Sequence, residues 1–352
     1  MLINQKQNTI SSSKILVTGG LGFIGSHTCV ELIQKGFDVL IVDDLSNSTI
    51  DVLEGIKKIT RMSPEFVQLD LKDKEAVQKL FEHHQDLSAV IHFAAYKAVG
   101  ESVTKPLEYY QNNLNALVYL LQAIEKKGME FPFIFSSSCT VYGQADALPI
   151  TEESPIKKAA SPYGNTKQIG EQILQDTAYA NPLLKVISLR YFNPIGAHPS
   201  NEIGELPLGT PQNLIPFITQ TAAGIQEKLL VFGDDYPTPD GTCIRDYIHV
   251  SDLAKAHVVA LERLHSKGKN DSFEIYNLGT GQGNSVLEVI KTFEKISGQP
   301  LNYEITSRRE GDIVAAYADT TKANEILGWK TQLDLEAALK TAWEWEKKNR
   351  RI

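Results

Sequence analysis

One glycine-rich stretch near the start of the chain, TGGLGFIG at 18–25, limits the possible folds more than any other segment. It follows a short β-type run at 14–18 and precedes a helical pattern at 27–35. Gly19, Gly22 and Gly25 have the spacing G-x-x-G-x-x-G, which permits a tight turn and lets a diphosphate approach backbone N–H groups at a helix N-terminus. Glycines alone could serve only the turn, but their place between a strand and a helix favours a dinucleotide-binding βαβ unit.

Apolar β-type runs and helical patterns alternate through the first half of the chain. The runs are almost continuously apolar, which is typical of strands buried on both faces of a parallel sheet. This order predicts an α/β fold with a doubly wound, parallel-sheet Rossmann domain. The expected strands are 14–18, 39–43, 65–70, 89–94, 133–138 and 184–190, and the expected helices are 27–35, 73–83, 106–126 and one that opens at 161.

The regular alternation ends near residue 191, where a long Gly- and Pro-rich loop spans 191–211. Loops of this length in a compact protein are usually functional or disordered. Helical patterns follow at 214–223, 252–263, 285–297, 321–327 and 335–348, with short β-type runs at 229–232, 275–277 and 301–305. We expect a dinucleotide-binding domain at 1–190, with 1–13 as a flexible tail, and a smaller mixed α/β C-terminal substrate lobe at 191–352, with chain crossings between the lobes.

Charge and cysteine usage exclude several classes of partner. The chain has 35 Lys and Arg against 43 Asp and Glu, a formal net charge of −8, and no basic run, which argues against nucleic acid or an anionic membrane. The three cysteines are far apart and fit a reducing cytoplasm. The eight histidines form no H-E-x-x-H pair, so no metal site is expected. No apolar run reaches the roughly 18 residues of a membrane-spanning helix.

An acid at the end of the second predicted strand identifies the dinucleotide. Asp43 stands 18 residues after Gly25, where a carboxylate accepts from ribose hydroxyls and repels a 2′-phosphate. The predicted cofactor is therefore NAD, with Asp44 as the nearest rival for this role. Asp70 also ends a strand and could accept from the adenine amino group, although a solvated strand-end acid is as plausible.

The stretch SPYGNTK at 161–167 places a tyrosine and a lysine four residues apart on a predicted helix. Ser161 is a typical N-cap and Pro162 a typical first helical residue, so Tyr163 and Lys167 lie one turn apart on the same face. A nearby ammonium group favours the phenolate and would make the tyrosine a usable base. An ordinary surface pair is the alternative. Ser138, at the end of the fifth predicted strand, adds a hydroxyl where ligands bind in this architecture, and favours a hydride-transfer site.

At this point the chain resembles the extended short-chain dehydrogenase/reductase family and, within it, the UDP-glucose 4-epimerases. The resemblance runs from Lys14 to about Trp345. It rests on TGGLGFIGSHTCVEL, IHFAAYKAVGESVTKPLEYYQNN, FIFSSSCTVYG, SPYGNTK, LRYFNPIGAHP, FGDDYPTPDGTCIRDYIHV and YNLGTGQGNSVLEV.

The resemblance implies roles for individual residues. The catalytic residues would be Ser138, Tyr163 and Lys167. The implied NAD-binding residues are Gly19, Gly22, Phe23, Ile24, Gly25, Asp43, Asn47, Ser48, Asp70, Leu71, Phe93, Ala94, Ala95, Lys97, Asn112, Ser136, Tyr163, Lys167 and Tyr191. The implied UDP-hexose-binding residues are Lys97, Ser138, Thr140, Tyr163, Phe192, Asn193, Asn213, Leu214, Phe232, Arg245, Arg309, Asp312 and Ala316.

Two departures refine this expectation. Related sugar-nucleotide 4,6-dehydratases carry Thr-Asp-Glu after the strand-five serine, whereas Cys139 and Thr140 follow Ser138 here, which disfavours a dehydratase. In family members restricted to glucose and galactose, a tyrosine gate lies a few residues after R-E-G-D. Ala316 takes that place here and would admit UDP-N-acetylhexosamines, unless Tyr317 refills the space or Ala316 only fills the core.

Two other functions remain possible from the sequence. One is a different UDP-sugar short-chain enzyme, such as a uronate 4-epimerase or a decarboxylase. The other is an NAD-sensing regulator without catalysis, although such proteins typically lose the Tyr-Lys pair that this chain keeps. By family precedent the enzyme would be a homodimer joined through the helices at 106–126 and 161–180.

Overall fold

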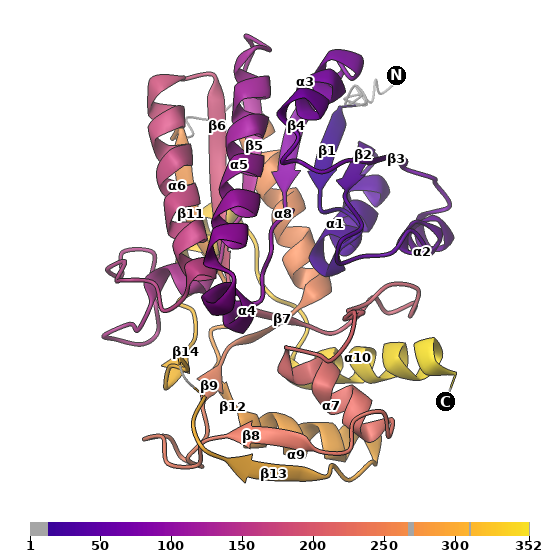
Figure 1. Ribbon diagram of the computed structural model, residues 1–352, viewed down its shortest axis with the longest axis vertical. Helices are drawn as coiled ribbons and strands as arrows, with labels where there is room; N and C mark the ends of the chain where they lie inside the picture. Colours follow the sequence, from indigo (N-terminus) through magenta and orange to yellow (C-terminus); the bar gives the residue numbers. More distant parts are fainter. Residues whose placement is uncertain (1–12, 267–270, 310, 352) are drawn as a thin grey trace, which may run out of the picture.

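A computed structural model describes residues 13–266, 271–309 and 311–351 of the chain. Within them, the largest sheet has seven parallel strands in the order β3-β2-β1-β4-β5-β6-β11. The expected Rossmann architecture is confirmed (Figure 1). The strands are β1 Lys14–Thr18, β2 Asp38–Asp43, β3 Glu65–Gln68, β4 Leu87–His92, β5 Phe131–Ser136, β6 Leu184–Tyr191 and β11 Phe273–Leu278. Apart from Ser13, the predicted tail lies outside the described residues.

Helices cover both faces of this sheet (Figure 1). One face packs against α1 and α8, and its core includes Ile15, Val30 and Leu261. The other face packs against α3, α5 and α6, and its core includes Leu16, Leu120 and Phe133. Burial on both faces explains the continuously apolar strands. The helices are α1 Phe23–Gln34, α2 Val52–Thr60, α3 Lys74–His83, α4 Val99–Thr104, α5 Pro106–Glu125, α6 Pro162–Ala180 and α8 Val250–His265.

The remaining elements form a smaller lobe beside the carboxyl ends of the strands (Figure 1). Its core joins Ile218, Val231, Phe293 and Trp343. The helices are α7 Leu214–Ala222, α9 Val286–Ser297, α10 Leu335–Arg350 and the π-helix η2 Ala323–Leu327. The strands form small sheets from β7 Asn193–Ile195, β8 Leu229–Phe232, β9 Ile244–Arg245, β10 Tyr247–His249, β12 Asn284–Ser285, β13 Tyr303–Thr306 and β14 Ala315–Ala316.

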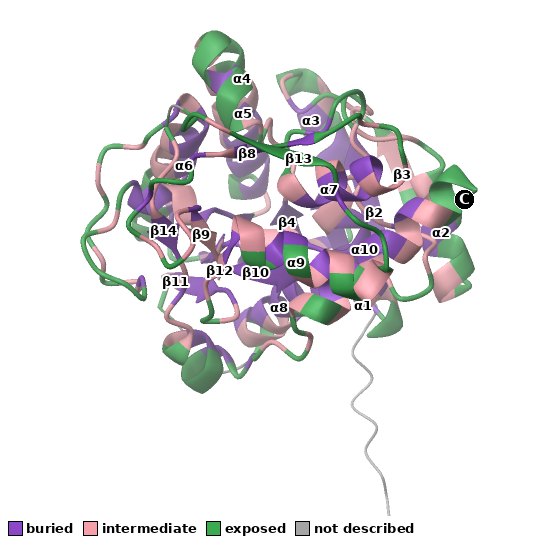
Figure 2. Ribbon diagram, turned by 90° about the horizontal axis from the view of Figure 1, so that it is seen from below, coloured by how far each residue is buried: buried purple, intermediate pink, exposed green. Residues whose placement is uncertain are grey.

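Burial follows the same division. In Figure 2 the buried residues gather in the large sheet and on the inner sides of the helices, whereas the outward turns of α9 are exposed. The capping box of α9 fixes its start, since the Ser285 hydroxyl accepts from the Glu288 N–H and the Glu288 carboxylate accepts from the Ser285 N–H. The lobe therefore has its own core and its own helix start signal.

Several expected elements need correction. Strand β11 and helix α8 were both assigned to the smaller lobe. Strand β11 is instead the last strand of the large sheet, where it pairs with β6, and α8 packs on one face of that sheet. Strand β5 ends at Ser136 and not at Ser138, because the Ser138 hydroxyl accepts from the Thr140 N–H and caps the 3₁₀ turn η1 Cys139–Tyr142. Helices α2 and α4 were missed. Helix α4 has only six residues, too few for a periodic pattern, whereas α2 has nine residues with a clear amphipathic pattern that was passed over.

Candidate functional site

The glycine turn between β1 and α1 is built by close backbone approach. Gly19 has φ +67°, and an added Cβ would stand 2.8 Å from the backbone N of Ala94. A Cβ on Gly25 would stand 2.2 Å from the Gly19 carbonyl oxygen. Helix α1 thus begins at Phe23, earlier than the expected residue 27, because Gly25 is a helical residue whose missing side chain makes room for the turn. Phe23 and Ile24, both expected to contact the cofactor, form the first turn of this helix.

The N-terminus of α1 fits a diphosphate. Gly22 is the N-cap, no side chain caps the free N–H groups, and the first turn carries no acid. Such an end favours an anion through its N–H groups and its dipole. The turn has no room for a Cβ at Gly19 or Gly25, and it leads into an uncapped helix. A bound dinucleotide requires both features.

Asp43 ends β2 beside this turn and is almost fully buried. Its Oδ2 accepts from the Leu21 N–H at 3.1 Å, and its Oδ1 accepts from the Leu45 N–H at 3.0 Å and the Ser48 hydroxyl at 2.8 Å. The rival Asp44 instead accepts from the N–H and the hydroxyl of Ser46. Asp43 is therefore the carboxylate placed at the glycine turn.

The other expected adenosine-side residues are more loosely held. Asn47 is exposed, and Leu71 is buried in the core beneath. Asp70 is exposed, accepts from the Lys72 N–H at 2.9 Å and faces the Lys72 ammonium at 3.5 Å. The structure thus places the Asp70 carboxylate in its own turn, in keeping with the solvated-acid alternative.

Tyr163 and Lys167 lie in the first two turns of α6, which Ser161 caps by accepting from the Gly164 N–H. Both side chains are buried, with 7% of Tyr163 and 5% of Lys167 exposed, so they are not a surface pair. The Lys167 ammonium donates to the Ser136 carbonyl at 2.7 Å and lies 4.9 Å above the Phe135 ring and 5.9 Å from the Tyr163 ring centroid. Ser138, at the same strand end, is also buried.

The electrostatics of this pair differ from the expectation. Burial raises the pKa of Tyr163 above its ordinary value, Tyr191 adds to the increase, and the hydrogen bond with Ser138 lowers it. Burial also lowers the pKa of Lys167 to about 8, against an opposing effect of the Glu171 carboxylate. Lys167 was expected to lower the pKa of the Tyr163 phenol. Desolvation outweighs that effect, because both side chains are buried.

One hydroxyl beside the pair has no partner. The Thr140 Oγ is buried and makes no hydrogen bond within the described residues, although Thr140 donates its N–H to Ser138 Oγ. A buried polar atom without a partner is costly, so it points to a ligand group at this position. Its neighbour Cys139 has a pKa raised to about 12 by burial and cannot act as an acid–base pair with it at neutral pH.

Further expected cofactor residues surround the strand ends. Phe93 packs on His257 at 4.6 Å, and Ala94 N–H donates to the Thr18 carbonyl at 3.2 Å. The Tyr191 and Ser136 hydroxyls share a hydrogen bond of 2.6 Å. Ala95 is partly buried between Ala94 and Tyr96.

The sequence analysis missed Asn113, the neighbour of the expected Asn112. The Asn113 side chain accepts from the Tyr96 N–H at 2.8 Å and donates to the Tyr96 carbonyl at 3.1 Å and to the Thr166 hydroxyl at 3.0 Å. It therefore ties the loop after β4 to α6. Asn112 is held in turn, since its amide donates to Asn113 Oδ1 at 3.1 Å. An apolar helical pattern gives no signal for such a buried amide.

Glu205 was missed as well. Its Oε1 accepts from the Lys97 ammonium at 3.3 Å and from the Asn213 amide at 2.7 Å, and its carbonyl accepts from the Trp345 indole at 2.9 Å. Lys97 follows β4, whereas Asn213 caps α7 in the smaller lobe and precedes Leu214, the first residue of that helix. One carboxylate of the Gly- and Pro-rich loop thus bridges two expected ligand-binding residues from opposite lobes.

Three of the expected nucleotide-binding residues of the smaller lobe, Phe232, Arg245 and Arg309, lie near Asp312 or its partner. Arg309 donates to Asp312 Oδ1 at 2.8 Å and its guanidinium lies 5.5 Å from the Phe232 ring centroid. Arg245 approaches the same oxygen at 3.8 Å from β9. Two guanidinium groups converge on one carboxylate here, an arrangement that leaves donors for phosphate oxygens.

Ala316 lies on β14 opposite Arg245 of β9 and is buried in a small cluster with Tyr142, Ile150 and Phe192. The Tyr317 ring lies elsewhere, since a Cβ on Gly283 would meet its Cδ1 at 3.0 Å. Adjacent residues of a strand point to opposite faces, so the Tyr317 ring does not share the Ala316 face. Phe192 and Asn193 bring the start of the long loop to the same region, and Asn193 pairs with Tyr247 of β10.

Two features of the described residues concern metal binding and membrane insertion. In the described part of the chain, no group of three or more His, Cys, Asp or Glu side chains could hold a metal ion. Over the same residues, no helix has the length and apolar character needed to cross a bilayer. Cys29, Cys139 and Cys243 are free.

Comparison with known proteins agrees along nearly the whole chain. Residues 16–342 match the family described as GDP-mannose 4,6 dehydratase. The UDP-glucose 4-epimerase of Bacillus subtilis is 51% identical over 336 residues, which cover 95% of this chain and 97% of that protein. The crystal structure of UDP-glucose 4-epimerase from Bifidobacterium longum, in complex with NAD⁺ and UDP, has a TM-score of 0.91, 47% identity and coverage of 96% and 99%.

A third relative bears on the choice of sugar. The UDP-Glc/GlcNAc 4-epimerase of Campylobacter jejuni has a TM-score of 0.81, 38% identity and coverage of 96% and 99%. All three cover the glycine turn, the Tyr163–Lys167 helix and the smaller lobe. Since identity of this extent includes both halves of the site, the chain belongs to the UDP-glucose 4-epimerases of the extended short-chain dehydrogenase/reductase family.

Proposed function

We propose that the protein is an isomerase that inverts C4 of UDP-hexoses, interconverting UDP-galactose and UDP-glucose with bound NAD. The observation that carries the proposal is the convergence of buried Ser138, Tyr163 and Lys167 beside a glycine turn that fits a diphosphate. Family membership supports the same reaction. The glycine turn and Asp43 would hold NAD, which would supply the reversible acceptance of hydride from C4 of the sugar.

The protein's own residues transfer the proton and bind the diphosphate of the substrate. Tyr163 takes the proton of the 4-hydroxyl group as a phenolate and later gives it back, and Ser138 hydrogen-bonds the same oxygen. Because burial raises the pKa of Tyr163, the phenolate depends on positive charge nearby, which Lys167 supplies when protonated. Arg245 and Arg309 would hold the diphosphate, which leaves the 4-keto sugar free to turn its other face toward the site.

The residues after Ser138 favour epimerisation over dehydration. Elimination of the C6 hydroxyl as water needs an acid and a base beside the sugar. Cys139 is kept protonated by burial and Thr140 does not titrate, so neither can act as a carboxylate of this kind. The family description that names a dehydratase is therefore broader than the chemistry this site supports.

The test uses purified protein without added cofactor. UDP-galactose is supplied and the products are resolved by proton NMR, with UDP-glucuronate as a second substrate. Conversion to UDP-glucose supports the proposal. Conversion of UDP-glucuronate alone would favour a uronate epimerase or a decarboxylase, and retained NAD without any turnover would favour an NAD-sensing protein.

We further propose that UDP-N-acetylgalactosamine and UDP-N-acetylglucosamine are interconverted. Ala316 has the smallest chiral side chain at the gate position, and the Tyr317 ring packs on the other face beside Gly283. Ala316→Tyr should lower turnover of UDP-N-acetylgalactosamine about tenfold or more, with UDP-galactose turnover within about threefold. Tyr317→Ala is the matched control and should leave the turnover of both sugars within about threefold of the parent. Equal losses on both sugars in Ala316→Tyr would refute the gate.

Three properties complete the proposal. The free cysteines suit a reducing cytoplasm, and the substrate points to galactose and carbohydrate metabolism. A homodimer would use the outer faces of α5 and α6, where Leu107 and Tyr179 are among the most exposed large side chains. The division into an NAD domain at 1–190 and a UDP-sugar lobe at 191–352 is kept as a proposal, with β11 as a crossing between them.

A further inference from the structure

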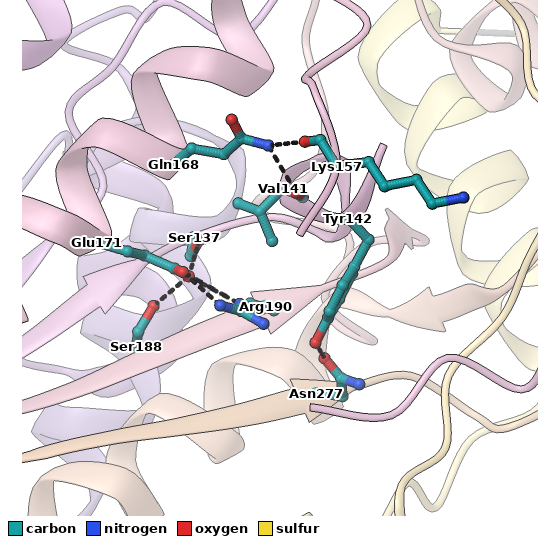
Figure 3. A network of polar contacts seen from close by, with 9 residues as sticks. All are labelled: Ser137, Val141, Tyr142, Lys157, Gln168, Glu171, Ser188, Arg190 and Asn277. Atoms are coloured by element: carbon teal, nitrogen blue, oxygen red, sulfur yellow. Dashed lines mark hydrogen bonds and ion pairs between the residues drawn. The ribbon is translucent and has the colours of Figure 1, made fainter. Parts of the chain in front are cut away.

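The proposed catalytic groups come from two separate elements that must keep a fixed distance. Ser136 and Ser138 stand where β5 ends, whereas Tyr163 and Lys167 stand on α6. The residue between the two serines, Ser137, donates its hydroxyl to Glu171 Oε1 at 2.7 Å (Figure 3). Glu171 lies one helical turn beyond Lys167 on α6. This hydrogen bond is one of several between α6 and the segment around Ser138, since Lys167 donates to the Ser136 carbonyl at 2.7 Å and Gln168 donates to the Val141 carbonyl at 2.8 Å.

Glu171 is itself held firmly. Its Oε1 also accepts from the Ser188 hydroxyl at 2.8 Å, and Arg190 binds the carboxylate as a fork, with Nε at 2.9 Å from Oε1 and Nη2 at 2.6 Å from Oε2 (Figure 3). Glu171 is 5% exposed and Arg190 2% exposed, so the pair is desolvated. The Arg190 guanidinium also lies 4.8 Å from the Tyr142 ring centroid. A buried, bidentate pair of this kind has little freedom to move.

We propose that Glu171 is a positioning residue for the C4 inversion, which acts through Ser137 on the strand-end turn and through its charge on Lys167. This inference rests on the proposed function, since it assigns Glu171 to the reaction proposed above. Ser137 N–H also donates to the Leu189 carbonyl at 2.9 Å, so the turn is fixed from the backbone as well as from the side chain. Glu171 is the residue of α6 that accepts the Ser137 hydroxyl, beside the bonds that Lys167 and Gln168 make to the same segment.

Ser188 offers a matched comparison. Both serines are fully buried and both donate to the same oxygen, at 2.7 and 2.8 Å. They differ in position, because Ser137 lies between Ser136 and Ser138 whereas Ser188 lies on β6. A merely structural carboxylate would make the two hydroxyls equivalent, whereas a positioning carboxylate makes only Ser137 matter for turnover.

The charge of Glu171 faces Lys167 among few other titratable groups. His92 on β4 does not titrate near neutrality, since burial and then the Lys167 charge lower its pKa to about 3. Burial raises the pKa of Tyr191 to about 12, and Arg190 stays protonated. The Tyr163 ring and His92 also lie near the Lys167 ammonium, whereas Tyr191 and Cys139 act on the Tyr163 phenol and Arg190 pairs with Glu171.

The first experiment compares kcat for UDP-galactose in Ser137→Ala and Ser188→Ala. We expect kcat to fall about 10-fold or more in Ser137→Ala with KM nearly unchanged, and to stay within about threefold in Ser188→Ala. Urea unfolding of both variants checks that their stabilities match. Equal kcat values in two equally stable variants would overturn the proposal.

The second experiment separates charge from shape. In Glu171→Gln the alkaline limb of the kcat profile should move down by about one pH unit, because Lys167 loses its negative neighbour, whereas Glu171→Asp keeps the limb and lowers kcat. Since Glu171→Gln leaves Arg190 without its partner, the Lys167 titration is also followed by NMR of lysine ε-¹⁵N groups, assigned through Lys167→Met. An unchanged midpoint in folded Glu171→Gln would refute the charge effect. If the parent protein converts no UDP-hexose, the proposed function fails, and this titration still tests the link.

Discussion

The two halves of the site are built in different ways. On the Rossmann side, Ser138, Tyr163 and Lys167 are each at most 7% exposed and are fixed by hydrogen bonds to neighbouring backbone and side chains. On the side of the smaller lobe, 57% of the Arg309 side chain is exposed and Arg245 reaches Asp312 only at 3.8 Å. Under the proposed function, proton transfer would use the buried, hydrogen-bonded half, whereas the UDP group would be held by the more exposed half, where the Arg309 guanidinium remains available to phosphate.

The largest effect should come from the buried half. Tyr163→Phe removes the proton acceptor and should lower kcat about 1,000-fold or more, with bound NAD retained. Tyr303→Phe, at an exposed position on β13, is the control and should keep full activity. Turnover of UDP-galactose by proton NMR measures both. Activity of Tyr163→Phe within about tenfold of the parent would show that another group carries the proton.

Lys167 should make the free energy of unfolding depend on pH, because its ammonium group is buried. Its pKa falls from 10.5 to about 8 on folding, so the unfolded chain binds this proton more tightly and stability rises between about pH 8 and about pH 10.5. The rise from this group is at most roughly 3 kcal/mol. Lys167→Met should be inactive, more stable than the parent at neutral pH, and should lack this rise. Parallel stability curves from urea unfolding across this pH range would contradict the prediction.

The more exposed half should respond in substrate binding. Arg245→Met removes a diphosphate donor and should raise KM for UDP-galactose about 10- to 100-fold, with kcat changed only a few-fold. Arg308→Met is a control, because Arg308 is exposed and pairs with Asp235. Steady-state kinetics distinguish the outcomes. A loss confined to kcat would place Arg245 in the proton-transfer half and remove the contrast between the halves.

The smallest effect is expected where the halves meet. Glu205→Gln weakens the bridge between Lys97 and Asn213 and should change kcat/KM about two- to fivefold, since exposed ion pairs contribute little. Glu202→Gln, in the same loop but paired with Lys58 and Lys348, should leave kcat/KM unchanged. Identical values for both variants would show that the bridge does not couple the lobes.

The fold was largely predictable because it depends on periodic patterns. Continuously apolar strands and the glycine turn predicted the Rossmann order, which the structure confirms. Helix α4 was missed because six residues are too few for a periodic pattern, and the end of β5 was misplaced because a cap hydrogen bond at Ser138 decides it and apolar spacing does not.

The site was predictable only in part, for a related reason. Tyr163, Lys167 and Asp43 stand at positions that local patterns mark, whereas Asn113 and Glu205 acquire their contacts from segments far away in the sequence. The balance of desolvation against charge, which raises the pKa of Tyr163, also needs the buried environment that no local pattern describes.

The position of β11 late in the sequence has a consequence for the folding of the chain during its synthesis. The sheet that is expected to bind NAD is completed by residues 273–278, which pair with β6 only after the chain has built much of the other lobe. During translation, residues 1–190 would leave the ribosome with the β6 edge unpaired, and such an edge invites pairing with other chains. A nascent chain halted before residue 273 should therefore be prone to aggregation, and the two lobes should mature together rather than in sequence.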